Sequence, residues 1–319
     1  MSNQRFSVTI NQNAAHPVVV LKDHESNCWA EVFAFGGLLN RFQWETGGKK
    51  VQVIKGYASV AEARQKIAEG FNSAKLSPFV CRMRNGQYSW QGQKRQVHKH
   101  FLGKHAIHGL VYDLPYQIKE SHADATLARV GLSAQYKKTD QGYPHSFSIQ
   151  LIWTLSADQT LTITTLVQHQ EPQTIPYADG WHPYFSLGNK VDNCRLQFNA
   201  RRQLVFDAEL LPTKKEITNE SFLRPLSLKG KNLDNSFLFE PGTEAKCVLS
   251  NAQWQLDILP GPEYPVLQVY TPMHRNSIAI ENLSGAPDNF NNGIGLLSLE
   301  PNKEYAFTTR YRLSKVKQT

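Results

Sequence analysis

A glutamate at the end of an apolar segment is the first candidate for acid–base chemistry. Glu281 ends the run 277–281, whose apolar residues are typical of a buried strand. Burial of a carboxylate raises its pKa from about 4.3 toward neutrality, which suits a general base. The alternative is a surface glutamate at the end of a strand.

A histidine among aromatic residues is the second candidate. His182 lies in the sequence Trp181-His182-Pro183-Tyr184-Phe185. Proline fixes the backbone beside the imidazole, and aromatic rings suit the apolar C–H faces of a sugar or pack in a core. We therefore take His182 as a candidate acid–base group and Trp181 as a candidate sugar-binding residue, with a purely structural histidine as the alternative.

Two further polar segments could contribute to a site. Asp234 follows Asn232, so it either caps a turn or accepts two hydrogen bonds from a polyol. Four histidines fall within residues 98–108, but no cysteine or carboxylate joins them and their spacing matches no helix-borne zinc site. We expect His98 and His100 to lie in solvent, one or two of the others to line a pocket, and no metal or cofactor to be needed.

The elements that must position these groups are predicted to be mainly strands. Apolar residues alternate along 147–155 and again along 161–167, with a turn at 156–160 between them, which predicts a long hairpin. Similar alternating runs predict further strands at 18–21, 29–35, 50–54, 130–136, 254–259, 267–271 and 305–311.

One segment predicts a helix. Ser59 can cap it, Glu62 completes a capping box, and the helix would end near Gly70. A single short helix among many strands favours an all-β fold of two packed antiparallel sheets. Because no repeat or linker interrupts the chain, we expect residues 1–319 to form one domain.

Composition excludes several classes of function. The net charge of +8 is not clustered along one track, which argues against nucleic-acid binding but leaves a phosphorylated substrate open. The four cysteines are isolated, so we expect reduced, mostly buried thiols. The polar N-terminus lacks the apolar core of a signal peptide and no run has membrane-spanning length, so we expect a cytoplasmic protein with no membrane partner.

Taken in order, these motifs make the chain resemble the aldose 1-epimerase (galactose mutarotase) family. The resemblance extends from Phe35 to the C-terminal strand, and its markers are Pro78-Phe-Val-Cys-Arg82-Met-Arg-Asn-Gly86-Gln-Tyr, Ile107-His108-Gly109, His182-Pro-Tyr-Phe185, Asp234-Asn-Ser-Phe237, Gln268-Val-Tyr-Thr271, Glu281 and Pro287-Asp-Asn-Phe290. It implies a galactose mutarotase-like large antiparallel β-sandwich with one or a few short helices.

The resemblance also implies roles for individual residues. Glu281 would remove the proton from the anomeric hydroxyl, while His182 would protonate the ring oxygen and His108 would contact the sugar nearby or share the acid role. Asp234, Arg82 and Gln268 would bind the sugar. Cys81 and Leu110 depart from the residues that the family often has, which affects the expected substrate more than the expected reaction.

The predicted function is thus interconversion of the α and β anomers of a free hexose by acid–base ring opening and closure. One alternative is a hexose-6-phosphate 1-epimerase, for which Arg82, Arg84 and Lys104 lie near the motifs. Others are a non-catalytic carbohydrate-binding protein of the same fold and a metal-dependent enzyme that uses the histidines. The expected partner is a small-molecule sugar. Whether the chain is a monomer or a homodimer is left open, as is which sugar it takes.

Overall fold

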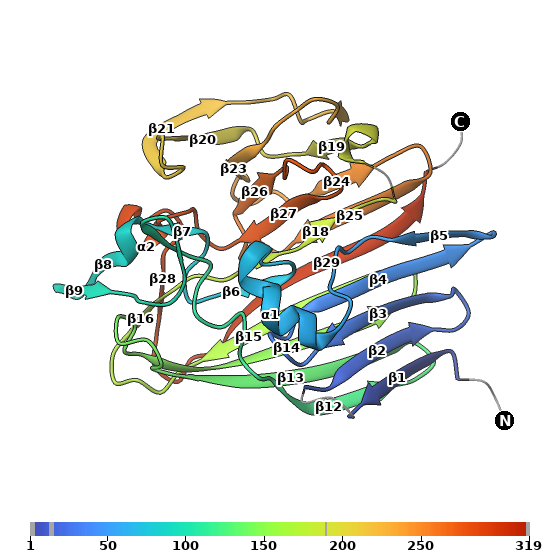
Figure 1. Ribbon diagram of the computed structural model, residues 1–319, viewed down its shortest axis with the longest axis horizontal. Helices are drawn as coiled ribbons and strands as arrows, with labels where there is room; N and C mark the ends of the chain where they lie inside the picture. The colour runs from blue at the N-terminus through green and yellow to red at the C-terminus, as the bar shows by residue number, and fades with distance from the viewer. Residues whose placement is uncertain (1–3, 13–15, 189, 317–319) are drawn as a thin grey trace.

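Strands in which every second side chain is buried dominate the fold. The computed structural model describes residues 4–12, 16–188 and 190–316 (Figure 1). Strands β14 (Ser146–Ser156) and β15 (Thr160–Gln168) form the predicted hairpin, with Trp153 opposite Ile163. The other predicted strands are also present, with shifts of a few residues at their ends. Local hydrophobic alternation therefore locates the long central strands, whereas other strands such as Phe6–Asn11, Leu39–Thr46 and Gln117–Ala123 were not predicted.

One layer of the sandwich is a single antiparallel sheet of nine strands. In spatial order these are β12 (Gln117–Ala123), β13 (Leu127–Lys137), β14, β15, β29 (Tyr305–Lys315), β25 (Trp254–Pro260), β24 (Cys247–Ser250), β19 (Arg195–Phe198) and β22 (Leu226–Ser227).

The opposite layer is built from two sheets that meet at a bridge between Ile54 and Phe185. The five-stranded sheet contains β1 (Phe6–Asn11), β2 (Val18–Asp23), β3 (Cys28–Phe33), β4 (Leu39–Thr46) and β5 (Lys49–Gln52). The eight-stranded sheet contains β21 (Pro212–Thr218), β20 (Arg202–Phe206), β23 (Asp234–Leu238), β26 (Val266–Tyr270), β27 (Ile278–Leu283), β17 (Gly180–His182) and β6 (Ala74–Leu76), with β18 (Tyr184–Phe185) also paired to β27.

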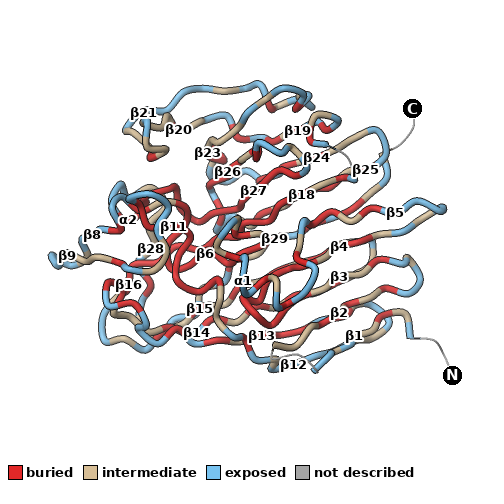
Figure 2. The backbone as a smooth tube through the Cα atoms, in the orientation of Figure 1, coloured by how far each residue is buried: buried red, intermediate tan, exposed pale blue. Residues whose placement is uncertain are grey.

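Aromatic side chains fill the space between the layers. Trp153 packs edge-on against Trp181 at 5.4 Å between ring centroids, and Phe185 packs against Tyr311 at 5.5 Å. Buried residues run along the central strands, whereas exposed ones gather at the hairpin tips (Figure 2). All four cysteines are buried and free, as predicted. These observations confirm the all-β sandwich of antiparallel sheets that was expected from the sequence.

Shorter elements gather at one end of the molecule (Figure 1). They are β7 (Arg82–Met83), β8 (Gln87–Trp90), β9 (Gln93–Gln96), β10 (Phe101–Leu102), β11 (His105–Ile107), β16 (Ile175–Tyr177), β28 (Leu297–Leu299), the 3-10 turn Arg84–Gly86 and the helix α2 (Asn289–Asn292). A second 3-10 turn, Val191–Asn193, lies elsewhere, before β19. None of these short elements, including the helix α2, was predicted from the sequence.

The predicted helix is α1 (Val60–Gly70). The Ser59 side chain accepts a hydrogen bond from the Glu62 N–H at 3.2 Å, and Phe71 ends the helix in the left-handed conformation. The Glu62 carboxylate reaches back to the N–H of Ala58, at 2.7 Å, one residue earlier than a capping box requires. Within the described ranges, no helix is long and apolar enough to cross a membrane.

Candidate active site

Central strands of the eight-stranded sheet place the polar candidates around one cavity. On β26 and β27, Gln268 lies directly opposite Glu281. His182 ends β17, and Asp234 begins β23 opposite Tyr270. The cavity measures about 350 Å³ and is lined by Ala68, Glu69, Gly70, Phe71, Cys81, Arg82, His100, Leu102, Ile107, His108, His182, Tyr184, Phe206, Leu210, Asp234, Gln268, Tyr270, Glu281 and Pro287.

A buried carboxylate and a buried imidazole meet in this cavity. The distance from His182 Nε2 to Glu281 Oε1 is 3.4 Å, and both residues are at most 5% exposed. Burial raises the pKa of Glu281 well above its usual range, and the charge of nearby Asp234 adds to this effect. Burial lowers the pKa of His182 to about 4. Since desolvation disfavours both charges, the pair favours a state in which one shared proton leaves both groups neutral.

The second histidine lies against the first. The rings of His108 and His182 are 4.8 Å apart and nearly perpendicular. Burial is the main cause that holds the pKa of His108 well below its usual range, and the neighbouring charges of His182 and Arg82 lower it further. This imidazole is therefore neutral at pH 7. The Nδ1 atoms of both histidines are buried without a hydrogen-bond partner among the described residues. Buried polar atoms without a partner are rare and are often found at functional sites.

Asp234 and Gln268 form an oriented polar pair on the adjacent strands. Gln268 Nε2 donates to Asp234 Oδ1 at 2.7 Å, while Ser236 Oγ donates to the side-chain amide oxygen Oε1 of Gln268. Burial raises the pKa of Asp234, although the Arg82 guanidinium and the Gln268 hydrogen bond act in the opposite direction. The fixed amide and carboxylate present acceptors to the cavity, as expected for groups that hold sugar hydroxyls.

Cys81 contacts the candidate base and was not proposed as a site residue from the sequence. Its thiol donates to Glu281 Oε2 across 3.9 Å, a long and weak contact. Burial and the Glu281 charge raise the pKa of Cys81 well above its usual value, so the thiol remains a neutral donor. The sequence feature that could have indicated Cys81 as a site residue is its position directly before Arg82 in the family motif.

The expectation that Trp181 binds the sugar is wrong. Trp181 is not part of the cavity wall; it packs on Trp153 in the core, and Lys75 Nζ lies 4.7 Å from its ring centroid. Successive side chains of a strand point to opposite faces. Because His182 faces the cavity from β17, its neighbour Trp181 must face the core.

The four clustered histidines have different environments. His98 is exposed, as predicted, and lies 3.4 Å from Asp140. The expectation that His100 is solvated is wrong, because His100 lines the cavity and packs on Phe71 at 5.0 Å. His105 is buried and accepts a hydrogen bond from the N–H of Asn85. Within residues 4–12, 16–188 and 190–316, no three His, Cys, Asp or Glu side chains are grouped as a metal site would require.

The backbone around the cavity is strained. Phe71, Cys81, His100 and His108 are non-glycine residues with φ between +45° and +62°. Such conformations cost free energy and persist where the surrounding structure holds them, commonly at functional sites. The N–H of His108 donates to the Cys81 carbonyl oxygen at 2.9 Å, so two of these residues hold each other in place.

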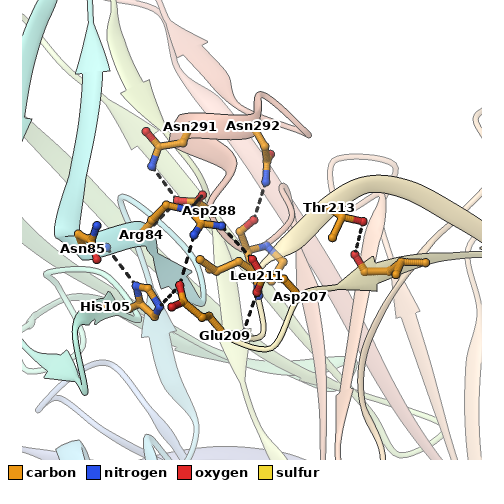
Figure 3. A network of polar contacts seen from close by, with 12 residues as sticks. Arg84, Asn85, His105, Asp207, Glu209, Leu211, Thr213, Asp288, Asn291 and Asn292 are labelled. Atoms are coloured by element: carbon orange, nitrogen blue, oxygen red, sulfur yellow. Dashed lines mark hydrogen bonds and ion pairs between the residues drawn. The ribbon is translucent and has the colours of Figure 1, made fainter.

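A polar network beside the cavity fixes the loop that follows β20 (Figure 3). Arg84 contacts Asp207 at 3.1 Å, Glu209 at 3.3 Å and Asp288 at 3.8 Å. Lys104 also pairs with Glu209. This network positions Leu210 in that loop and Phe206 at the end of β20, and both residues line the cavity. Arg84 and Lys104 are therefore neutralised by carboxylates outside the cavity, and of the three candidate phosphate ligands only Arg82 lines it.

Sequence comparison identifies the family that this fold and site define. The sequence profile of the aldose 1-epimerase family matches residues 17–312, so the chain belongs to that family. It is 28% identical to the uncharacterized protein YihR of Escherichia coli strain K12 over 238 residues, which cover 72% of this chain and 75% of YihR. It is 25% identical to an aldose 1-epimerase of Haemophilus influenzae over 225 residues, which cover 64% of each chain.

Solved structures share the fold at low sequence identity. A galactose mutarotase-like protein from Clostridium acetobutylicum superposes with a TM-score of 0.86 at 15% identity, covering 98% of this chain and 99% of the other. A galactose 1-epimerase from Lactobacillus acidophilus superposes with a TM-score of 0.83 at 17% identity, with the same coverage. At these identities the structures show a common fold alone.

Proposed function

We propose that this protein interconverts the α and β anomers of a free, unphosphorylated aldose. The observation that carries the proposal is the buried contact of Glu281 with His182 in a polar cavity. Ring opening of a hemiacetal requires one proton to leave the anomeric hydroxyl and one to reach the ring oxygen. A carboxylate and an imidazole side by side can perform these two transfers without a net exchange of protons with solvent.

In the proposed mechanism, the proton that the pair shares moves from Glu281 to His182 when the sugar binds. Glu281 then takes the proton of the anomeric hydroxyl, and His182 delivers its proton to the ring oxygen. The C1–O5 bond breaks, the C1–C2 bond rotates, and the reverse transfers close the ring on the other face. His108, neutral and in ring contact with His182, hydrogen-bonds near the ring oxygen. Asp234, Gln268 and Arg82 hold the remaining hydroxyls. Each proton transfer contributes a factor of about 10²–10⁴ to the rate.

The charge of the cavity supports an unphosphorylated substrate over a hexose 6-phosphate. Three carboxyl groups line it, those of Glu69, Asp234 and Glu281, against the single guanidinium of Arg82. A phosphate carries close to two negative charges and is usually held by several cations or N–H donors.

The proposal is tested by NMR measurement of anomer exchange on a panel of neutral and 6-phosphorylated aldoses. Wild-type protein should accelerate the exchange of a neutral aldose, and Glu281→Gln and His182→Asn should each reduce kcat by at least about 10²-fold. The control is Glu45→Gln, because Glu45 is an exposed strand residue outside the cavity.

A carbohydrate-binding protein without catalysis gives a different result. It would bind sugars in a titration but leave their exchange rates unchanged. Faster exchange that persists in both folded variants would also refute the assigned roles. The buried Glu281 and His182 favour the enzyme, because binding alone does not require an acid–base pair.

A further inference from the structure

A second cavity opens beside the proposed aldose site. It measures about 450 Å³, against about 350 Å³ for the first. Four residues line both cavities: Glu69, Gly70, Tyr184 and Tyr270. A ligand that fills the first cavity can therefore continue past the two tyrosines into the second.

Two exposed side chains with hydrogen-bond donors, Lys55 and His274, lie against each other in this second cavity. His274 Nδ1 accepts the N–H of Asn276 at 3.0 Å, and burial, followed by the charge of Lys55, lowers the pKa of His274. A neutral imidazole carries one proton, which must then lie on Nε2. Lys55 Nζ is 3.2 Å from that same Nε2. The Lys55 ammonium and the His274 Nε2–H are thus two neighbouring donors that cannot bond to each other. One oxygen acceptor of a ligand could accept a hydrogen bond from both.

Acceptors and apolar surface lie in the same cavity. The Glu69 carboxylate makes no hydrogen bond or ion pair with the described residues. Lys66 is already paired with Glu62 at 3.0 Å, so the charges of Lys55 and Glu69 leave the lining close to neutral. Unsatisfied donors and acceptors beside tyrosine rings match a neutral, hydroxyl-rich ring and not an anion.

The position of these residues is fixed by the fold. The N–H of Lys55 donates to the carbonyl oxygen of Tyr184 at 2.9 Å, which ties the segment that follows β5 to β18, close to His182. The turn that carries His274 is held by Arg275, which contacts Asp192 at 2.7 Å. The donors are thus presented from anchored backbone.

We propose that the second cavity is a subsite for a second neutral sugar unit, so that the preferred substrate is the reducing end of a disaccharide. This proposal rests on the proposed anomer exchange in the first cavity. The reducing sugar occupies the first cavity, and its neighbour lies beside Tyr184 and Tyr270 within reach of Lys55, His274 and Glu69.

The experiment compares anomer exchange of glucose with maltose, and of galactose with β-1,4-galactobiose, in wild type and in Lys55→Met/His274→Ala. For at least one pair, wild type should show a kcat/KM about five- to tenfold higher for the disaccharide. The double variant should lose that advantage, about tenfold, with the monosaccharide rate unchanged within twofold. Lys50→Met, at an exposed lysine of β5 outside both cavities, is the matched control.

Three results would overturn the subsite. The first is equal kcat/KM for monosaccharide and disaccharide, and the second is an equal loss on both sugars in the double variant. The third is a preference for glucose 6-phosphate that Lys55→Met abolishes, which would assign an anion to this cavity. If no sugar is exchanged, the proposed function fails separately. In that case, maltose and glucose are titrated separately into the protein, and binding is monitored by NMR chemical shifts. Tighter binding of maltose that the double variant loses supports the subsite, and equal binding of the two sugars rejects it.

Discussion

A buried ion pair beside β17, the strand that carries His182, gives a prediction whose size follows from its contacts. Lys75 and Asp179 pair with both side chains fully buried. Tyr264 OH donates to Asp179 Oδ2 at 2.7 Å, Tyr177 OH donates to Oδ1 at 3.0 Å, and Lys75 Nζ also donates to the Gly180 carbonyl oxygen at 3.2 Å. The change Lys75→Met keeps the apolar stem and leaves the carboxylate without its cation.

Removal of one partner of a buried pair costs about 3–5 kcal/mol. We expect the lower end, about 3 kcal/mol, because two tyrosine hydroxyls still serve Asp179. At roughly 2–4 °C per kcal/mol, the midpoint of thermal unfolding should fall by about 6–12 °C. The double change Lys75→Met/Asp179→Asn removes both charges and should recover most of that loss, because a neutral pair needs no compensation.

Loss of the Lys75–Asp179 ion pair should also affect activity. Lys75 lies opposite Trp181 in the β6–β17 pairing, and the next position places Ala74 opposite His182. Below its unfolding transition, Lys75→Met should therefore show slower anomer exchange together with lower stability in guanidinium titrations. The control is Lys50→Met. A variant within 1 kcal/mol of wild type, or a double variant as unstable as the single one, would refute the reasoning.

Three further outcomes follow from the site and the helix. Asp234→Asn removes the charge that is, next to burial, the largest cause of the raised pKa of Glu281. The pKa of Glu281 should therefore fall, and the acid limb of the pH profile of kcat/KM should move to lower pH. An acid limb that does not move would contradict this coupling. Gly109→Ala places a Cβ 2.3 Å from the Ser77 carbonyl oxygen at a φ of +78°, so we expect both reduced stability in urea and slower anomer exchange; retention of either refutes the strain argument. Ser59→Ala should lower the free energy of unfolding by about 1 kcal/mol through the lost cap while leaving kcat unchanged.

Local patterns explain why so much of the fold could be predicted from the sequence. The β14–β15 hairpin and the helix α1 depend on alternation, turn residues and a cap within one segment. Their ends shift by a few residues because strand pairing extends beyond the apolar run. The helix α2 has four residues and no apolar stripe, so no periodic pattern could indicate it.

The site was predictable only where residue type and neighbours were informative. The predicted residues Glu281, His182 and His108 line one cavity because β27, β17 and the loop after β11 converge there. Trp181 was assigned from its chemistry, although strand alternation already required it to face away from His182. The contact of Cys81 with Glu281 spans 200 positions of sequence, so only the tertiary fold brings the two together.

Two arginines in one motif illustrate how the fold decides the chemistry of the cavity. Arg82 lies on β7 opposite Ile107 and lines the cavity, where its guanidinium opposes the raised pKa of Asp234. Arg84 lies two residues later, beyond the end of the strand, and its backbone N–H donates to Asp288 while its side chain contacts Asp207. The sequence offers both as phosphate ligands, but only one positive charge reaches the cavity. Because a single guanidinium lies among three carboxyl groups, the cavity favours hydroxyls, which donate as well as accept hydrogen bonds, over a phosphate, which needs several cations or N–H donors.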